Sequence, residues 1–470
     1  MSIKSGIFPD IWKTAKVVPI HKKGSTQDRG NFRPISILST LSKLIERHIH
    51  TAFYAFLKAN NLLHLAQSGF RHLFSCESAL ANIINKWTEA IDDDKLVGVI
   101  LLDLRKAFDL IDHDILLEKL KLYKCSESTM AWFKSYLFER NQCTTFKGNI
   151  SDKLPITTGV PQGSILGPLL FILFINDLPL AVKNSEIDMY ADDSTATSTA
   201  DTTDQLNNNL NADAENINNW CEDNRMAANT TKTKAALITT WQKRLSLPED
   251  QRQLQVSMNG ESLENVTSDK LLGVTIDHNL SWKQHIQNIA SLVNSKLALL
   301  RRIKRYMPLS TRKLFYDTHI LPHMDYCSTI WGSSPHVKNL LLTQKRAARV
   351  ILDIRDICHP SKDMFRTLKW MPIHDRITYR KVTMVYKSLN DLTPPYMRNM
   401  FKYVKDTHGR TTRASVKNDL YLPPGKHKEV YTSSFAYSAA LAWNNLGLNI
   451  RVKSSLNSFK DTYIKDYYRA

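Results

Sequence analysis

The segment that decides the fold is Leu96-Val-Gly-Val-Ile-Leu-Leu-Asp103, a continuous apolar run that ends on a carboxylate. Its short length and its β-branched residues predict a strand that is buried on both faces. A second strand is predicted at Ile187-Asp-Met-Tyr-Ala191, followed by a turn at Asp192-Asp193 and a returning strand at Ser194-Thr-Ala-Thr197. Acidic side chains therefore stand at the ends of two predicted strands, with Asp103 and Asp192 89 positions apart.

These two acidic sites suggest one shared site for divalent metal. Mg²⁺ takes oxygen ligands and needs only one or two carboxylates when substrate phosphates supply further ligands. Two such ions about 3.5–4 Å apart would activate a 3′-hydroxyl and stabilise a leaving pyrophosphate. Because neighbouring side chains in a hairpin point to opposite faces, Asp192 is predicted to be the ligand that pairs with Asp103. The alternative for Asp192-Asp193 is a solvated turn, where Asp is favoured by its local hydrogen bonds.

The rest of the chain mixes helices with strands. A helix over residues 80–91 has one apolar face, because its large apolar residues recur at helical spacing. Asp112 and Asp114 suit the start of another helix, which runs through Leu120. Other predicted elements are a strand at 15–21, a Gly/Pro-rich loop at 159–167, an apolar helix at 169–178, a polar helix at 203–226, a strand at 235–239 and a helix at 286–300. The pattern predicts an α+β protein.

The composition argues against several classes of protein. The chain has 470 residues, of which 43% are hydrophobic and 23% charged, and this argues against a disordered or fibrous protein. The longest nearly apolar run, 165–175, is too short to span a bilayer, which takes about 18 residues. Lys4, Asp10 and Lys13 interrupt any apolar core of a secretion signal. We therefore expect an intracellular protein, in nucleus and cytoplasm, with no membrane partner and no identified targeting signal.

The net charge indicates the kind of partner that the protein binds, and the spacing of the cysteines bears on zinc binding. Sixty-three Lys and Arg against 45 Asp and Glu give a formal net charge of +18, and a surplus of this size favours a polyanionic partner, either nucleic acid or an anionic membrane surface. The six cysteines never come closer than 18 positions, which excludes a zinc ribbon or knuckle of the usual local spacing. Buried free thiols are the expected state.

Several short motifs carry a family resemblance. In order along the chain they are Trp12-Lys-Thr-Ala-Lys-Val-Val-Pro-Ile20, Asn31-Phe-Arg-Pro-Ile-Ser36, Leu102-Asp-Leu-Arg-Lys-Ala-Phe-Asp109, Gly159-Val-Pro-Gln-Gly-Ser164, Tyr190-Ala-Asp-Asp193, Leu272-Gly-Val274, Leu321-Pro-His-Met-Asp-Tyr-Cys-Ser-Thr-Ile-Trp-Gly332 and Pro394-Pro-Tyr396. The chain resembles the reverse transcriptases of non-LTR retrotransposons, and the downstream motifs resemble the jockey-type branch. The resemblance covers most of the chain. A set of motifs of this size, all in the order found in the family, is specific for that family.

The resemblance implies a right-hand polymerase. Fingers and an antiparallel-sheet palm would occupy residues 1–275, a thumb-like helical segment 276–350, and a mostly helical C-terminal region of unknown role 351–470. A full-length element of this kind carries an endonuclease domain ahead of the polymerase. None is present in this sequence, so we expect an N-terminally truncated chain.

The resemblance also assigns the catalytic residues. Asp103, Asp192 and Asp193 match the family's catalytic aspartates, which hold two Mg²⁺ ions, with Mn²⁺ as a possible substitute. Lys232 resembles the lysine proposed to protonate the leaving pyrophosphate, although Lys234 is an alternative match. By residue chemistry alone, Lys232 would be an ordinary loop residue.

Four further residues match the nucleotide-binding positions of the family. Arg33 matches the arginine that holds the triphosphate, and Lys22 is a second cation whose register is ambiguous. Phe108 matches the aromatic residue that obstructs a 2′-hydroxyl, and Gln162 the residue that contacts nucleotide and template. The structural alternatives are a core aromatic for Phe108 and a plain loop residue for Gln162.

A basic cluster ends the helix predicted at 286–300. The resemblance places it in the thumb, where it would bind the backbone of a template–primer duplex. The alternative, compatible with the first, is a cationic last turn that complements the helix dipole. The cluster consists of Arg301, Arg302, Lys304 and Arg305.

The resemblance implies an RNA-directed DNA polymerase that extends a DNA 3′ end on an RNA template. Its partners would be the RNA template, a DNA primer or nicked target DNA, and deoxynucleoside triphosphates. The alternative is a catalytically inactive nucleic-acid-binding relic of such an element, truncated or domesticated. A cellular polymerase of the telomerase or maturase type is a third, weaker possibility. The sequence indicates neither the oligomeric state nor the template RNA.

Overall fold

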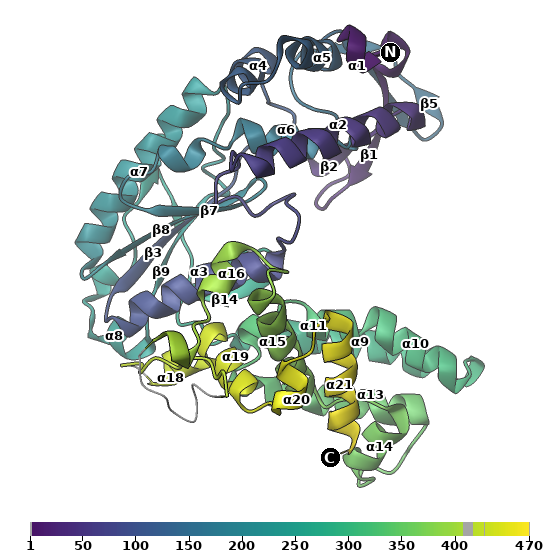
Figure 1. The fold of residues 1–470 in the computed structure, drawn as a ribbon, viewed down its shortest axis with the longest axis vertical. Helices are drawn as coiled ribbons and strands as arrows, with labels where there is room; N and C mark the ends of the chain where they lie inside the picture. Colours follow the sequence, from purple (N-terminus) through teal and green to yellow (C-terminus); the bar gives the residue numbers. More distant parts are fainter. Residues whose placement is uncertain (1, 408–416, 427, 470) are drawn as a thin grey trace.

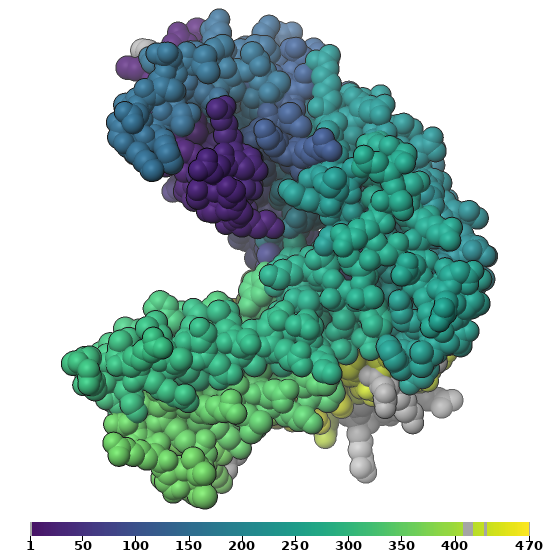
Figure 2. All heavy atoms as spheres, turned by 180° about the vertical axis from the view of Figure 1, so that it is seen from behind, coloured from purple at the N-terminus to yellow at the C-terminus, as the bar shows by residue number. Residues whose placement is uncertain are grey.

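The computed structural model describes residues 2–407, 417–426 and 428–469. The molecule has the shape of a letter C (Figure 1). An N-terminal arm and a helical C-terminal arm extend from the two ends of a central sheet (Figure 1). The space-filling view shows a deep hollow between these two arms (Figure 2). The expected mixture of helices and strands is confirmed.

The central sheet has five strands in the order β12-β9-β3-β8-β7. The middle strand is β3 (Leu96–Leu102), which pairs antiparallel with β8 (Asp193–Ala200) and β9 (Lys234–Ile238). The edge strand β7 (Glu186–Tyr190) pairs antiparallel with β8, and the short β12 (Glu264–Asn265) pairs parallel with β9. The sheet is thus antiparallel as expected, apart from this two-residue strand at one edge.

Strand β3 is buried on both faces because a helix covers each side. Val97 and Val99 join the core around α3 (Cys76–Asp92), whereas Leu96 and Ile100 join the core around α7 (Thr203–Asp223). Figure 1 shows α7 on the outer face and α3 between the sheet and the C-terminal arm. Alternate side chains of one strand therefore feed two separate cores.

Gly98 permits the close approach of α7. A Cβ atom at this position would lie 2.8 Å from the Leu210 Cδ1 atom and 3.3 Å from the Leu206 Cδ2 atom. Glycine inside a strand often marks such an approach, so the one residue that weakens the apolar run has a packing role.

The N-terminal arm contains a second five-stranded sheet. Strand β1 (Thr14–His21) pairs antiparallel with β2 (Phe32–Ile37) and parallel with β4 (Arg140–Phe146). The short strands β5 (Asn149–Ile150) and β6 (Leu154–Ile156) both pair with β4. The remaining N-terminal helices are α1 (Ser2–Ser5), α2 (Thr40–Ala59), α4 (His113–Leu122) and α5 (Glu127–Leu137). Asp112 caps α4, as predicted, by accepting from the Asp114 and Ile115 amides.

The predicted turn at Asp192-Asp193 is wrong by one residue. Tyr190 pairs with Asp193, so the two turn residues are Ala191 and Asp192, and Asp193 begins β8. Ala191 adopts a left-handed φ of 56°. Its amide donates to the Gln67 Oε1 atom at 3.0 Å, a long-range contact that no local turn propensity encodes.

The apolar helix predicted at 169–178 is shorter than expected. Helix α6 spans Gly167–Phe174, and a separate 3-10 turn follows at Leu178–Leu180. Between them, the Asn176 side-chain amide donates to the Leu62 carbonyl oxygen at 2.8 Å and to the Tyr123 hydroxyl at 2.8 Å. The distribution of apolar residues did not reveal these polar contacts.

The C-terminal arm is helical, as expected. The long helices are α9 (Lys283–Ile303), α10 (Leu309–His319), α13 (Lys338–Leu352), α15 (Ile373–Leu389), α19 (Phe435–Asn444) and α21 (Leu456–Arg469). The shorter helices are α8 (Trp241–Ser246), which precedes the arm, and α11 (Leu321–Asp325), α12 (Ser328–Trp331), α14 (Ser361–Leu368), α16 (Pro395–Asn399), α18 (Lys428–Ser433) and α20 (Leu448–Arg451). Two small hairpins, β10 (Ser257–Met258) with β11 (Glu261–Ser262) and β13 (Ser268–Leu271) with β14 (Val274–Asp277), occupy the less regular stretch before α9.

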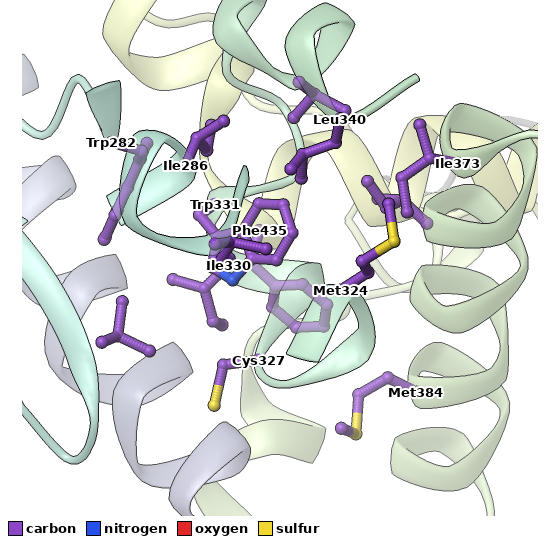
Figure 3. Close-up of a cluster of buried hydrophobic side chains, with 14 of the residues drawn as sticks. Trp282, Ile286, Met324, Cys327, Ile330, Trp331, Leu340, Ile373, Met384 and Phe435 are labelled. Atoms are coloured by element: carbon purple, nitrogen blue, oxygen red, sulfur yellow. The ribbon is translucent and has the colours of Figure 1, made fainter. Parts of the chain in front are cut away.

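One hydrophobic core joins the central sheet to the whole C-terminal arm. It runs from α3 and β3 through α9 and α13 to Tyr463 in α21. Figure 3 shows part of it, with Met324, Ile330, Trp331 and Phe435 close together. Residues on both sides of position 350 therefore share a single core.

Ion pairs reinforce this junction. Glu77 of α3 binds Arg380 of α15 at 3.0 Å across the junction, and within the arm Asp325 of α11 binds Arg376 of α15 at 2.6 Å. The Thr329 hydroxyl also donates to Glu77 at 2.8 Å. The position of the C-terminal arm against the sheet thus depends on polar contacts as well as on the core. No helix in the described part of the chain is both long and apolar enough to cross a membrane.

A buried carboxylate anchors the Gly/Pro-rich loop to the N-terminal arm. Glu46 of α2 is 0% exposed and accepts from the Ile165 amide at 2.7 Å and the Leu166 amide at 3.2 Å. Burial raises the pKa of Glu46, and the two backbone hydrogen bonds oppose that rise. Glu46 therefore satisfies donors at the start of α6 that would otherwise be buried without partners.

We expect Glu46→Ala to lower the free energy of unfolding by about 2–4 kcal/mol, because two buried amides lose their acceptor. Glu46→Gln keeps one acceptor oxygen and should cost less. Urea denaturation followed by tryptophan fluorescence measures both. The control is Glu118→Ala at an exposed position, which should change stability by less than about 0.5 kcal/mol. A Glu46→Ala variant as stable as this control would contradict the anchoring role.

Candidate active site

The two acidic segments meet where β3 ends and β8 begins. The last register pair of these strands is Leu102 with Ser194, so Asp103 directly follows β3 beside Asp193. Asp103, Asp192 and Asp193 line one open cavity of about 1090 Å³. The predicted proximity of the strand ends is therefore present in the structure.

The pKa values of Asp192 and Asp193 are shifted by burial and by neighbouring charges. The pKa of Asp193 is raised to about 6, first by burial and then by the charges of Asp192 and Asp103. The pKa of Asp192 is also raised, first by burial and then by the charge of Asp103. Like charges at short range disfavour ionisation, so the site concentrates negative charge that a cation would relieve.

The described residues do not form a complete set of metal-binding side chains. No group of three or more His, Cys, Asp or Glu side chains is arranged to hold a metal ion within residues 2–407, 417–426 and 428–469. This arrangement still fits Mg²⁺, which often binds through one or two carboxylates and completes its shell with waters and substrate phosphates. The donor set, carboxylate oxygens in mutual repulsion, has the appropriate chemistry for such a hard cation.

A loop at 229–233 holds Asp103 in place. The Asn229 side-chain amide donates to Asp103 Oδ2 at 2.9 Å, and the Asn229 backbone amide donates to the Asp103 carbonyl oxygen at 2.8 Å. The Asp103 amide in turn donates to the Thr233 hydroxyl at 3.2 Å. These contacts fix both the backbone and one carboxylate oxygen of Asp103.

The two candidate lysines have different environments. Lys232 lines the cavity, and its Nζ atom lies 3.9 Å from Asp103 Oδ2. Lys234 belongs to β9 and pairs with Asp269 at 3.0 Å. Of the two, Lys232 is the lysine beside the carboxylates.

The Gly/Pro-rich loop forms one wall of the cavity, and Gln162 lies on it. The Ser36 amide of β2 donates to the Gln162 carbonyl oxygen at 2.8 Å. Gly163 has a φ of +134°, and a Cβ atom there would lie 2.4 Å from the Ser36 carbonyl oxygen. Glycine is therefore required at this position for the loop to lie against β2.

Two cations face the carboxylates from the N-terminal arm. Arg33 of β2 and Lys22 after β1 line the cavity, and their charges act to lower the pKa of Asp192 against the effect of burial. Neither side chain forms an ion pair within the described part of the chain. Both are therefore available to an anionic ligand, and the planar fork of Arg33 suits phosphate oxygens.

Phe108 lies between the core and the cavity, so the structure agrees with both positions that the sequence left open. It lines the cavity, yet its ring stacks on the buried Phe171 with centroids 4.4 Å apart. Phe70, which is 49% exposed, meets the Phe108 ring edge-on at 6.1 Å. Phe108 is thus rigidly supported from the core while part of it faces the cavity.

Sequence reasoning missed several residues that line the cavity: Phe70, Arg105, Lys106, Asp109 and Asn229. Three of them lie within the motif that runs from Leu102 to Asp109, so proximity to Asp103 could have identified them. Phe70 and Asn229 had no local signal, because long-range packing brings them to the cavity.

The basic cluster at the end of α9 is divided. Arg301 and Arg302 are exposed, whereas Lys304 forms an ion pair with Asp353. The Arg305 guanidinium lies over the Tyr306 ring, 4.6 Å from its centroid. The cluster does not line the cavity, but Figure 1 places α9 and α10 on the side of the C-terminal arm nearer the N-terminal arm.

Comparisons with known proteins agree with this geometry. Residues 20–276 match the family described as "Reverse transcriptase (RNA-dependent DNA polymerase)". The chain is 28% identical over 359 residues to the "RNA-directed DNA polymerase from mobile element jockey" of Drosophila melanogaster, covering 74% of this chain and 38% of that protein. It is also 28% identical over 360 residues to the "Probable RNA-directed DNA polymerase from transposon BS" of the same organism, covering 74% and 39%. The chain thus spans about two fifths of the length of these relatives.

Among solved structures, telomerase from Candida albicans in complex with a fragment of telomeric RNA overlaps 76% of this chain and 66% of its own. Its TM-score of 0.41 and sequence identity of 11% are too low to carry an argument. The match over residues 20–276 covers more than half of the chain. This chain belongs to the reverse transcriptase (RNA-dependent DNA polymerase) family.

Proposed function

We propose that this chain is the RNA-directed DNA polymerase of a jockey-type non-LTR retrotransposon and extends a DNA 3′ end on an RNA template. The observation that carries the proposal is a single cavity whose lining includes Asp103, Asp192 and Asp193, the cations Lys22 and Arg33, and the Gly/Pro-rich loop. In this assignment residues 1–275 form fingers and palm, 276–350 the thumb, and 351–470 a C-terminal region that shares the core of the thumb.

Asp103, Asp192 and Asp193 would hold two Mg²⁺ ions, or Mn²⁺ in their place. When bound, the metal makes a hydroxyl more acidic and offsets charge that develops on phosphate oxygens. Asn229 donates to Asp103 Oδ2 at 2.9 Å, whereas the Oδ1 atom of Asp103 accepts from none of the described residues and would bind the metal. Burial and then the charges of Asp192 and Asp103 raise the pKa of Asp193 to about 6, and a bound cation would offset the charge repulsion.

The other cavity residues bind and orient the substrate. Arg33 and Lys22 would hold the triphosphate of a deoxynucleotide, because phosphoryl transfer depends on positioned charge more than on covalent chemistry. Lys232 would give a proton to the leaving pyrophosphate, and Phe108 would lie under the sugar. Gln162 would contact the nucleotide and its template. The proposed partners are therefore an RNA template, a DNA primer or nicked target DNA, and deoxynucleoside triphosphates.

We expect Asp103→Asn to abolish primer extension while leaving RNA binding nearly unchanged. The neutral amide cannot replace the charge of the carboxylate, and the rate should fall by about 10³-fold or more. Extension of a labelled DNA primer on RNA with Mg²⁺ measures activity, and fluorescence anisotropy measures binding. Asp152→Asn, at an exposed position outside the cavity, is the matched control and should retain activity. A wild-type chain that binds primed RNA but never extends the primer would refute the proposal.

We expect Phe108→Val to admit ribonucleotides. Removing the ring should reduce the preference for deoxynucleotides by about tenfold or more, because the obstruction beneath the 2′-hydroxyl is lost. Single-nucleotide incorporation with paired deoxy- and ribonucleotides measures the preference. If the variant loses stability but its sugar preference is unaltered, Phe108 serves only the core.

Binding of primed RNA should depend steeply on salt and little on base sequence. Each phosphate contact contributes a slope of about 0.9 in log K against log salt for B-form DNA. Replacing Arg301 and Arg302 together with Ala should therefore lower the slope by about 1.8. Lys304→Ala is the comparison variant and should change the slope less, because Asp353 already neutralises Lys304. An unchanged slope in the double variant would exclude both arginines from the interface.

A further inference from the structure

Gln162 is hydrogen-bonded to a side chain that the sequence motifs assign no role. Its Nε2 atom donates to Asp109 Oδ1 at 2.9 Å, and both residues line the cavity. An ionised carboxylate can only accept hydrogen bonds, whereas the two ends of a glutamine amide differ, one donating and one accepting. Asp109 therefore allows only one orientation of the amide. The Nε2 atom faces Asp109, and the Oε1 atom faces away from it.

The backbones of both partners are held independently of this bond. The Gly159 amide donates to the Ile111 carbonyl oxygen at 2.7 Å, and the Val160 amide to the Phe108 carbonyl oxygen at 3.0 Å. The Thr158 hydroxyl donates to the Asp109 carbonyl oxygen at 3.1 Å.

The close packing of the loop on residue 109 adds to this support. A Cβ atom on Gly159, whose φ is +81°, would lie 2.8 Å from the Asp109 Cα atom. The Ser36 amide fixes the far end of the loop through the Gln162 carbonyl oxygen. The loop would therefore keep its place without the Gln162–Asp109 hydrogen bond, so this bond is not needed for the fold and determines mainly the direction of one amide.

We propose that Asp109 is a positioning residue that turns the side-chain Oε1 atom of Gln162 toward the nucleic acid, where it accepts from a sugar hydroxyl. The inference deepens the proposed polymerase function and rests on it. An acceptor needs a donor, and phosphate oxygens supply none. Base edges in the minor groove supply only the guanine amino group, which could not serve every template. A sugar hydroxyl is present at every position of an RNA template, as the 2′-OH, and on every incoming deoxynucleotide, as the 3′-OH.

Asp109→Asn is the decisive variant because it keeps the size of the side chain and its hydrogen bond to Gln162. It no longer fixes the orientation of the Gln162 amide. An asparagine amide can face Gln162 with either end, so the Gln162 amide can turn over. If Asp109 served only to hold the loop, this substitution would be silent. We expect an unchanged melting temperature and a three- to tenfold loss of sugar discrimination, roughly the value of one hydrogen bond.

Two arms of the experiment identify the sugar. The first compares kcat/KM on RNA and DNA templates of the same sequence, and the second compares deoxynucleotides with 2′,3′-dideoxynucleotides on RNA. Loss of the first preference assigns the template 2′-OH, and loss of the second assigns the 3′-OH of the nucleotide. Asp152→Asn is the matched control and should preserve both preferences.

A double-mutant cycle tests whether Asp109 acts through Gln162. Gln162→Leu removes the amide, so adding Asp109→Asn to it should have no further effect on either preference. A further loss in that background would overturn the inference. It would be overturned equally if Asp109→Asn kept both preferences within twofold of the wild type.

One measurement separates this inference from the polymerase proposal. Fluorescence anisotropy in EDTA gives the ratio of Kd values for RNA–DNA and DNA–DNA primer–templates without any chemical step. A chain that never extends a primer refutes the proposed function. Such a chain can still bind the RNA template more tightly than the DNA template in EDTA. If Asp109→Asn reduces that preference, the inference is supported, with the template 2′-OH as the hydroxyl that Gln162 contacts. If the preference is unaffected in that chain, the inference fails as well.

Discussion

The burial of β3 on both faces is the constraint on which the rest of the structure depends. Because α3 and α7 each take alternate side chains of this strand, a shift of one residue would exchange its two cores. The register with β8 is therefore fixed, and with it the position of Asp103 beside Asp193. Gly98 contributes by admitting α7, so the most flexible residue of the strand helps to specify its place. The geometry of the site follows from the packing of the strand.

The cavity brings together groups that oppose one another in the absence of ligand. Burial and then the charges of Asp192 and Asp103 raise the pKa of Asp193 to about 6. Arg33 and Lys22 across the cavity offset only in part the rise in the pKa of Asp192. Such crowding works against stability and is typical of sites that bind a cation or a polyanion. Around these groups the structure is well anchored, by Glu46 under the loop and by Asn229 on Asp103. The stabilising contacts therefore lie around the cavity, and the charges that repel one another lie inside it.

The sequence predicted well where one local pattern determined one element. The apolar run of β3, the Asp112 cap of α4 and the strand at β1 were all readable, because periodicity and capping chemistry act over a few residues. The hairpin turn was misplaced by one residue because the Gln67 contact with Ala191, across 124 positions, decides it. The Lys304 ion pair with Asp353 was invisible for the same reason, so the basic cluster is less uniform than its sequence suggests.

By itself the sequence determined which strands carry the carboxylates, which loop is rich in glycine and proline, and which family the motifs resemble, since each of these is written in neighbouring residues. Tertiary structure alone decided which lysine stands beside Asp103, that Phe108 rests on Phe171, and that Asp109 orients Gln162. It also merged the thumb-like segment and the C-terminal region into one core. The physical reason is that hydrogen-bond direction and charge proximity depend on distances between segments far apart in the chain, which no local pattern records.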